Sequence, residues 1–85
     1  MLYMVVEHFK DAPEIYRRFG EKGRMMPEGL HYVSSWIDAE FNRCFQLMET
    51  DDAKLFEEWM ANWRDLMEFE IFPVMNSKEA AEKFW

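Results

Sequence analysis

Two short segments of the chain, LYMVVEHF (residues 2–9) and CFQLMET (residues 44–50), carry apolar side chains in both of their alternating positions. Successive side chains of a β-strand point to opposite faces of its sheet, so such a strand needs apolar cover on both faces. The first segment is also rich in β-branched and aromatic residues, which favour strands. We therefore expect both segments to be central strands of one sheet.

The segments around these two alternate between helical and extended patterns. Asp11, with Glu14 three positions later, predicts the start of a helix over residues 12–22 that ends near Gly23. LHYVSSWI (residues 30–37) and MEFEIFPVM (residues 67–75) are predicted as strands. Pro73 removes a hydrogen-bond donor from the last of these, which therefore belongs at a sheet edge or carries a bulge.

Two further helices are predicted in the second half of the chain. Residues 50–52, TDD, offer oxygens that cap a helix start, and an apolar stripe with helical spacing follows. The stripe consists of Leu55, Phe56, Trp59, Met60 and Trp63. Asn76, with Glu79 three positions later, predicts a short terminal helix.

These elements predict one ferredoxin-like α+β domain over residues 1–85, a βαββαβ sandwich with a short C-terminal helix. The length of 85 residues suits one domain. In that fold the first and third strands are central and the other two are edges. This agrees with the apolar side chains on both faces of the first and third strands, and with Pro73 in the fourth.

The same strands predict a homodimer. Two helices cover only one face of a four-stranded sheet, and here the uncovered face is also apolar. A contiguous apolar patch of several hundred Å² is rarely exposed by a monomer. We therefore expect two copies to pair through their sheet faces. The alternative is a monomer whose second face is covered by the last helix and by loops.

Composition excludes several classes of partner. The net charge of −7 disfavours nucleic acid and anionic membrane surfaces. Cys44 is the only cysteine, so no internal disulfide forms, and a cytoplasmic location is expected. Residues 1–6 lack the basic leader of a signal peptide, and no apolar run is long enough to span a membrane.

Gln46 is a polar residue in the middle of a predicted buried strand. A buried amide without partners costs roughly 1–3 kcal/mol per unsatisfied group, so Gln46 needs a partner. If the strand phases coincide, His8, Tyr32, Ser34, Trp36 and Gln46 line one partly polar cavity, and Tyr32, Ser34, Trp36 and Gln46 are the candidate ligand-binding residues. The alternative is a polar network within the core beside a packed Trp36.

His8 and His31 are the candidate catalytic residues, because histidine titrates near neutral pH. The alternative is that each is a solvated histidine at a strand end. Arg24 is either an anchor for an anionic ligand or a solvated ion-pair partner. No metal site and no cofactor are predicted, since the Cys and His residues lack ligand spacing and the three Gly fit no nucleotide-binding loop.

The strings MLYMVVE, GRMMPEGL, RCFQLMETDD and FEIFPV, together with Trp59 and Trp63, resemble a family of small bacterial proteins grouped as a domain of unknown function, DUF3303. The resemblance covers essentially the whole chain. It implies membership of the dimeric α/β-barrel superfamily of ferredoxin-like folds, and it implies no catalytic residues. Wider relatives of that superfamily include cofactor-independent monooxygenases, haem-degrading enzymes, small isomerases and stress-responsive dimers.

Three functions stay open at this point. The preferred one is a small molecule bound between sheet and helices. The second is a cofactor-independent monooxygenase or isomerase acting on a small aromatic or carbonyl compound, with one His as acid or base. A cavity of about 300 Å³ or more that holds both Gln46 and a His would favour the enzyme. The third, a structural or protein-interaction role, is favoured if no cavity exists.

Overall fold

The computed structural model describes residues 1–85. Its elements are, in chain order, β1 (Leu2–Phe9), α1 (Ala12–Lys22), β2 (His31–Ile37), β3 (Arg43–Glu49), α2 (Leu55–Met60), β4 (Met67–Val74) and α3 (Ser77–Phe84). The predicted order of strands and helices is therefore confirmed, and each strand begins and ends within one residue of its prediction.

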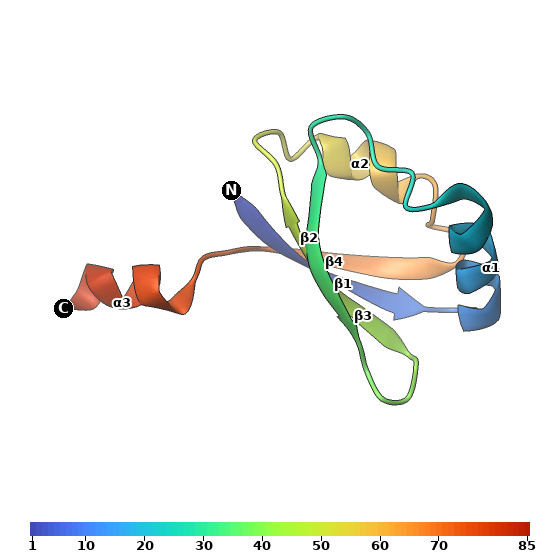
Figure 1. The fold of residues 1–85 in the computed structure, drawn as a ribbon, viewed down its shortest axis with the longest axis horizontal. Helices are drawn as coiled ribbons and strands as arrows, with labels where there is room; N and C mark the ends of the chain where they lie inside the picture. Colours follow the sequence, from blue (N-terminus) through green and yellow to red (C-terminus); the bar gives the residue numbers. More distant parts are fainter.

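The four strands form one antiparallel sheet in the order β2-β3-β1-β4 (Figure 1). The strands that are apolar on both faces, β1 and β3, are central, as predicted, and β2 and β4 are the edges. Pro73 lies in β4, where an edge position accommodates its missing N–H. The order of elements and of strands is compatible with a ferredoxin-like fold.

α1 begins and ends where its local sequence predicts. The Asp11 carboxylate accepts a hydrogen bond from the Glu14 backbone N–H at 3.2 Å, and Pro13 lies in the first turn. Gly23 follows the last turn with φ of +67°, a backbone conformation that glycine adopts without steric cost.

α2 is shorter than its apolar stripe predicts. The helix ends at Met60, and residues 61–66 form turns. The Trp63 N–H donates to the Met60 carbonyl at 2.9 Å, three residues back, so the chain stays coiled after the helix ends. Trp63 and Leu66 are therefore buried although neither lies in the helix.

The loop before α2 is held by polar side chains that do not cap the first turn. The buried Thr50 hydroxyl donates to the Gly29 carbonyl at 2.8 Å and accepts from the Asp52 N–H at 3.1 Å. The Asp52 carboxylate accepts from the Lys54 N–H at 3.0 Å. These residues shape the approach to α2, whose N-cap, Lys54, makes no side-chain capping bond.

The core lies between one face of the sheet and the helices α1 and α2 (Figure 1). Its aromatic side chains meet edge to face, with ring centroids 5.3 Å apart for Trp59 and Phe69 and 5.1 Å apart for Phe56 and Tyr3. The buried core residues are Val5, Ile15, Leu30, Met48, Phe56, Trp59, Met60, Trp63, Leu66 and Met67.

The other face of the sheet, here called the helix-free face, is apolar over its middle. Trp36 and Phe72 on this face are 55% and 46% exposed. Charged side chains lie at both ends of this face: His8 contacts Glu70 toward one end, and Glu49 pairs with the N-terminal amine at the other. By the strand register, the apolar side chains of the helix-free face are Leu2, Met4, Val6, Trp36, Phe45, Leu47, Phe72 and Val74.

α3 does not cover the helix-free face. It extends from the end of β4 away from the rest of the chain (Figure 1). Asn76 caps it as predicted, accepting a hydrogen bond from the Lys78 N–H at 2.7 Å. No residue of α3 is buried, and Phe84 and Trp85 are 81% and 96% exposed. The alternative prediction, a monomer in which the last helix covers the second face of the sheet, therefore does not match the observed position of α3.

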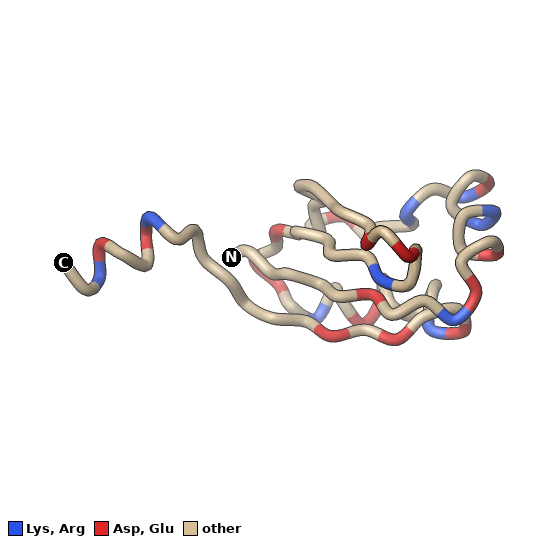
Figure 2. Tube along the Cα trace, turned by 90° about the horizontal axis from the view of Figure 1, so that it is seen from below, with Lys and Arg blue, Asp and Glu red and all other residues tan.

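Charged residues are dispersed over the molecule. Figure 2 shows Lys and Arg interspersed with Asp and Glu along α1 and α3, so the basic side chains form no separate surface. Of the three helices, none combines the length and the hydrophobicity that crossing a bilayer requires.

Candidate functional site

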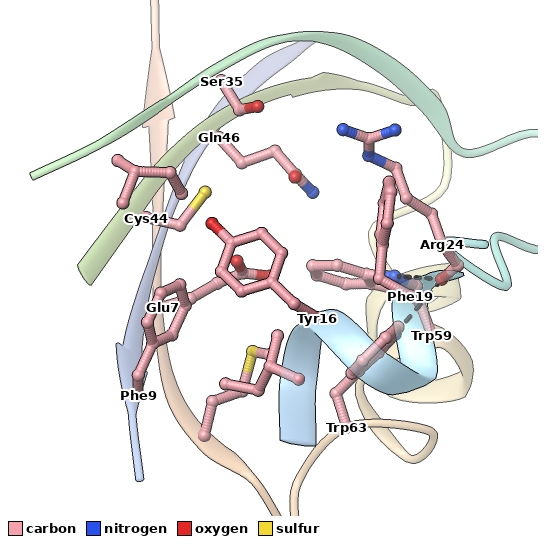
Figure 3. A pocket seen from close by; sticks show the side chains of 13 residues that line it. Glu7, Phe9, Tyr16, Phe19, Arg24, Ser35, Cys44, Gln46, Trp59 and Trp63 are labelled. Carbon is pink, nitrogen blue, oxygen red and sulfur yellow. Dashed lines mark hydrogen bonds between the residues drawn. The ribbon is translucent and has the colours of Figure 1, made fainter. Parts of the chain in front are cut away.

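A cavity of about 160 Å³ lies between the helix-bearing face of the sheet and α1 (Figure 3). Nine of its thirteen lining residues are hydrophobic. The lining residues are Glu7, Phe9, Ile15, Tyr16, Phe19, Arg24, Ser35, Ile37, Cys44, Gln46, Trp59, Trp63 and Met67. A mostly apolar wall with a few polar groups is the usual composition of a small-molecule site.

The strand register brings the polar residues of β1, β2 and β3 together. Glu7 pairs with Cys44, and one pleat further along β3 Gln46 pairs with Ser35. Side chains paired across neighbouring strands share a face, so these four residues lie in adjacent rows on the helix-bearing side. Arg24, from the loop between α1 and β2, enters the cavity from the opposite wall (Figure 3).

Glu7 is a buried carboxyl group, 7% exposed, and makes none of the ion pairs in the structure. Burial raises its pKa to about 7, while a hydrogen bond from the Cys44 thiol and the positive charge of Arg24 act in the opposite direction. Glu7 therefore populates both its protonated and its ionised form near neutral pH.

Cys44 is buried beside Glu7 and serves as its hydrogen-bond donor. Burial, with the negative charge of Glu7 added to it, raises the pKa of the Cys44 thiol to about 12. The thiolate is the nucleophilic form of cysteine and is scarce at neutral pH under these conditions. Cys44 therefore acts as a neutral wall residue and not as a nucleophile.

Gln46 is 4% exposed and makes one side-chain hydrogen bond, from its Nε2 to the Met48 Sδ at 3.3 Å. A thioether sulfur is a weak acceptor, whereas a primary amide offers two donors and two acceptor lone pairs. Most of the hydrogen-bonding capacity of Gln46 is therefore unused within the protein. Its side chain points into the cavity (Figure 3).

Arg24 is held in place through its backbone carbonyl and its guanidinium group. Its carbonyl accepts hydrogen bonds from the indole N–H groups of Trp59 at 3.0 Å and Trp63 at 3.1 Å. Its guanidinium carbon lies 3.7 Å from the ring centroid of Tyr32 and 4.9 Å from that of Phe19. No carboxylate pairs with it, so its N–H donors are free to bind an oxygen.

A bulge in β2 separates the residues predicted to line one cavity. The register shifts between Tyr32 and Ser34, so that Ser35 is the residue that pairs with Gln46. Ser34 and Trp36 consequently face away from the cavity that Gln46 lines. Tyr32 is on the cavity side but outside its lining, with its hydroxyl 2.8 Å from the Ser35 hydroxyl. The expected grouping is thus corrected: of the four, only Gln46 lines the cavity.

The two histidines lie outside the cavity. His8 is in the other phase of β1 from Glu7, on the helix-free face, where its Nε2 is 2.6 Å from the Glu70 Oε1. His31 is exposed at the start of β2. The cavity therefore holds Gln46 but no histidine, and it is smaller than the 300 Å³ set as favouring a histidine-dependent enzyme.

Glu7 was not singled out from the sequence, although a signal for it exists. It belongs to the same phase of β1 as Tyr3, Val5 and Phe9, so a charged residue falls in a row of core residues. A charged group inside a core phase needs either an ion-pair partner or a cavity. Because the residues around Glu7 are apolar in both phases of the strand, the prediction of a central strand did not single out its one carboxyl group.

Comparisons with known proteins identify a family but no activity. A family model described as "Domain of unknown function (DUF3303)" matches residues 1–84. No curated protein and no solved structure matches the chain. No group of three or more His, Cys, Asp and Glu side chains is placed to hold a metal ion.

Proposed function

The chain belongs to the DUF3303 family, whose description assigns it no activity, and we propose that the protein binds a small organic molecule in the cavity between sheet and helices. The single observation that carries the proposal is the unused hydrogen-bonding capacity of Gln46 at the wall of a mostly apolar cavity. The donors and acceptors that Gln46 does not use within the protein face the cavity, where a ligand can bond to them.

The polar groups of the cavity indicate the chemistry of the ligand. Gln46 offers both donors and acceptors, and the unpaired guanidinium of Arg24 offers donors with a positive charge. Apart from Glu7 and Ser35, the rest of the lining is apolar and aromatic. These features fit a compact apolar body that carries one carbonyl or carboxylate oxygen facing Arg24 and Gln46.

The volume limits the ligand to a small one. A cavity of about 150 Å³ with apolar walls is known to hold one benzene molecule. At about 160 Å³, this cavity accommodates a single six-membered ring or an open chain of similar size. A drug-sized ligand would need a cavity of at least about 300 Å³.

The test uses benzoate as the anionic probe and toluene as its neutral counterpart. Trp59 and Trp63 line the cavity, so their fluorescence reports binding. We expect saturable binding of benzoate, weakened about tenfold by Gln46→Leu because a hydrogen bond worth about 1.4 kcal/mol is lost. Ser34→Ala, on the helix-free face, is the matched control and leaves the affinity unchanged.

Two outcomes would overturn the binding proposal. One is the absence of saturable binding of either probe, together with native mass spectra in which freshly purified protein carries no small molecule. The other is a Gln46→Leu variant that loses stability while its benzoate affinity stays the same, because Gln46 would then serve only the core.

We further infer a homodimer paired through the helix-free face, in the manner of a dimeric α/β barrel. A large exposed apolar patch on a soluble chain is typical of an interaction surface. A second copy is the occupant that this surface suits, because a two-fold axis places the apolar middle of one face against the apolar middle of the other. Burial of Trp36 on β2 and Phe72 on β4 would provide one aromatic anchor on each edge strand of the interface.

α3 supports the same inference. An isolated helix of fewer than about 12 residues is marginal in water, and the eight residues of α3 have no buried side chain. A second copy would give its exposed end, Phe84 and Trp85, a surface to pack on. Since Cys44 forms no disulfide and the fold needs none, we place this dimer in the cytoplasm.

The subunit count is measured by native mass spectrometry and by analytical ultracentrifugation. We expect twice the chain mass at micromolar concentration, and single copies for Trp36→Glu, which puts a charge beside Phe45 among the apolar side chains of the helix-free face. Glu58→Lys, on an exposed turn of α2, is the control and stays dimeric. A wild-type chain that sediments as single copies would refute the dimer.

A further inference from the structure

We propose that Glu7 is a catalytic acid and base that moves a proton on a small enolisable carbonyl compound, while Arg24 and Gln46 hold the carbonyl oxygen. This inference rests on the proposed ligand-binding function and names the substrate class and the reaction for the same cavity. The reaction class is an isomerisation in which a carbon–carbon double bond moves into conjugation with the carbonyl.

The first support is the position of Glu7 relative to the oxygen-binding groups. Glu7 extends from β1 into the cavity, and Arg24 reaches it from the opposite wall with Gln46 between them (Figure 3). A ring-sized ketone whose oxygen lies at Arg24 and Gln46 would present its adjacent carbon atoms toward Glu7. A base on one side and oxygen-stabilising donors on the other is the arrangement that proton abstraction beside a carbonyl requires.

The second support is that Glu7 lacks a structural role. Buried carboxylates in proteins are ordinarily paired with a cation, because an unpaired one costs stability. Glu7 has no ion pair, and its one hydrogen-bond donor is the weakly donating thiol of Cys44. A carboxyl group that the fold retains at a cost, facing a cavity, fits a chemical task.

The protonation behaviour of Glu7 suits that task. Its pKa of about 7 lets it accept a proton and return it at neutral pH. The titratable or charged groups that face it are Cys44 from β3, Tyr16 from α1 and Arg24 from the loop after α1. The side chains that α2, the turn after it and β4 contribute to the cavity are apolar or aromatic and do not titrate.

Glu7 and the substrate supply all the protons and electrons that the reaction moves. Ionised Glu7 takes a proton from the carbon between the carbonyl and the double bond, and the electron pair of that C–H bond forms an enolate. The negative charge on the enolate oxygen is held by the Arg24 guanidinium and the Gln46 amide. Protonated Glu7, whose proton exchanges with water, then gives a proton to the far carbon of the former double bond. No oxidant, reductant or metal is consumed.

The test uses a six-membered cyclic ketone with its double bond one carbon removed from conjugation. Isomerisation yields the conjugated enone, which is followed by its ultraviolet absorption, and wild-type protein is expected to accelerate it over buffer. We expect Glu7→Gln to lower the rate at least about a hundredfold, the usual range for loss of a positioned general base. Glu58→Gln changes an exposed carboxyl that does not line the cavity, and this control keeps the full rate.

The pH profile separates a catalytic Glu7 from a merely structural one. The wild-type rate is expected to rise with pH and to level off above the pKa of Glu7, about 7, because only ionised Glu7 accepts the proton. In deuterated water the ketone is expected to exchange its acidic protons with wild-type protein and not with Glu7→Gln. Circular dichroism verifies that each variant is folded.

Each result bears on the inference separately from ligand binding. Isomerisation that persists in folded Glu7→Gln would overturn the role of Glu7. Saturable benzoate binding without isomerisation or deuterium exchange of the ketone would overturn the enzymatic inference and leave the binding proposal standing. If neither benzoate nor the ketone binds, both fail together.

Discussion

Burial of Glu7 makes the stability of this fold depend on pH in an unusual direction. The pKa of Glu7 is about 7 in the folded chain against an ordinary value of 4.5, so the folded state binds more protons between these two values. Its contribution to stability is therefore fully present below the ordinary pKa and is lost as the pH rises through about 7. Most carboxyl groups in proteins have the opposite effect.

Replacing Glu7 by Gln should remove this dependence. Relative to wild type, Glu7→Gln should gain about 3 kcal/mol of unfolding free energy between about pH 4 and about pH 9, from the difference in pKa. Urea unfolding followed by Trp fluorescence at both pH values measures the change. Glu58→Gln is the control and should follow wild type. Parallel pH curves for wild type and Glu7→Gln would show that Glu7 titrates normally.

The sequence predicted some residues of the cavity and not others, for local reasons. Gln46 stood out because it is the one amide in an apolar strand. Glu7 did not, since the strand around it is apolar in both phases. Ser34 and Trp36 were placed on the wrong face because a β-bulge inverts the phase of the strand after it, and no residue type in YVSSW marks the bulge.

The helices and strands of the chain were more predictable, because their ends depend on local chemistry. The cap at Asp11, the positive φ at Gly23 and the cap at Asn76 all act within one turn of the helix they delimit. α2 was predicted too long because the turns after Met60 keep nearly helical spacing, so the apolar stripe continues past the helix. Periodicity alone does not distinguish these two conformations.

The cap of α1 gives a direct measure of how much such local signals contribute. Asp11→Ala removes the carboxylate that accepts the Glu14 N–H and should lower the unfolding free energy by about 1 kcal/mol. The exposed loop variant Glu28→Ala should stay within about 0.5 kcal/mol of wild type. Chemical unfolding measures both. An Asp11→Ala variant as stable as Glu28→Ala would mean that solvent replaces the cap without loss.

At the level of the folded chain, the two faces of the sheet have different roles. The helix-bearing face combines a core with a cavity, and the polar groups of that cavity come from β1, β2, β3 and the loop after α1. The helix-free face has no cover within the chain, and α3 extends past it. The open face and the unpacked helix are two separate reasons to expect a second copy.

The terminal helix should contribute to the dimer rather than to the fold of each subunit. α3 follows β4, which is an edge strand of the sheet (Figure 1). A second copy paired through the helix-free face is therefore within reach of α3. Replacing both Phe84 and Trp85 by Ser should therefore raise the dimer dissociation constant at least about tenfold, a loss of about 1.4 kcal/mol.

The same double variant should leave the unfolding of the isolated subunit unchanged, because no residue of α3 is buried in it. A matched pair, Lys78→Ser with Glu82→Ser, changes the polar side of the helix at constant net charge and should keep the wild-type dissociation constant. Sedimentation equilibrium measures both. If the Phe84 and Trp85 variant dimerises like wild type, while Trp36→Glu separates the subunits, the interface consists of the sheet faces alone, because α3 would then contribute no binding energy to it.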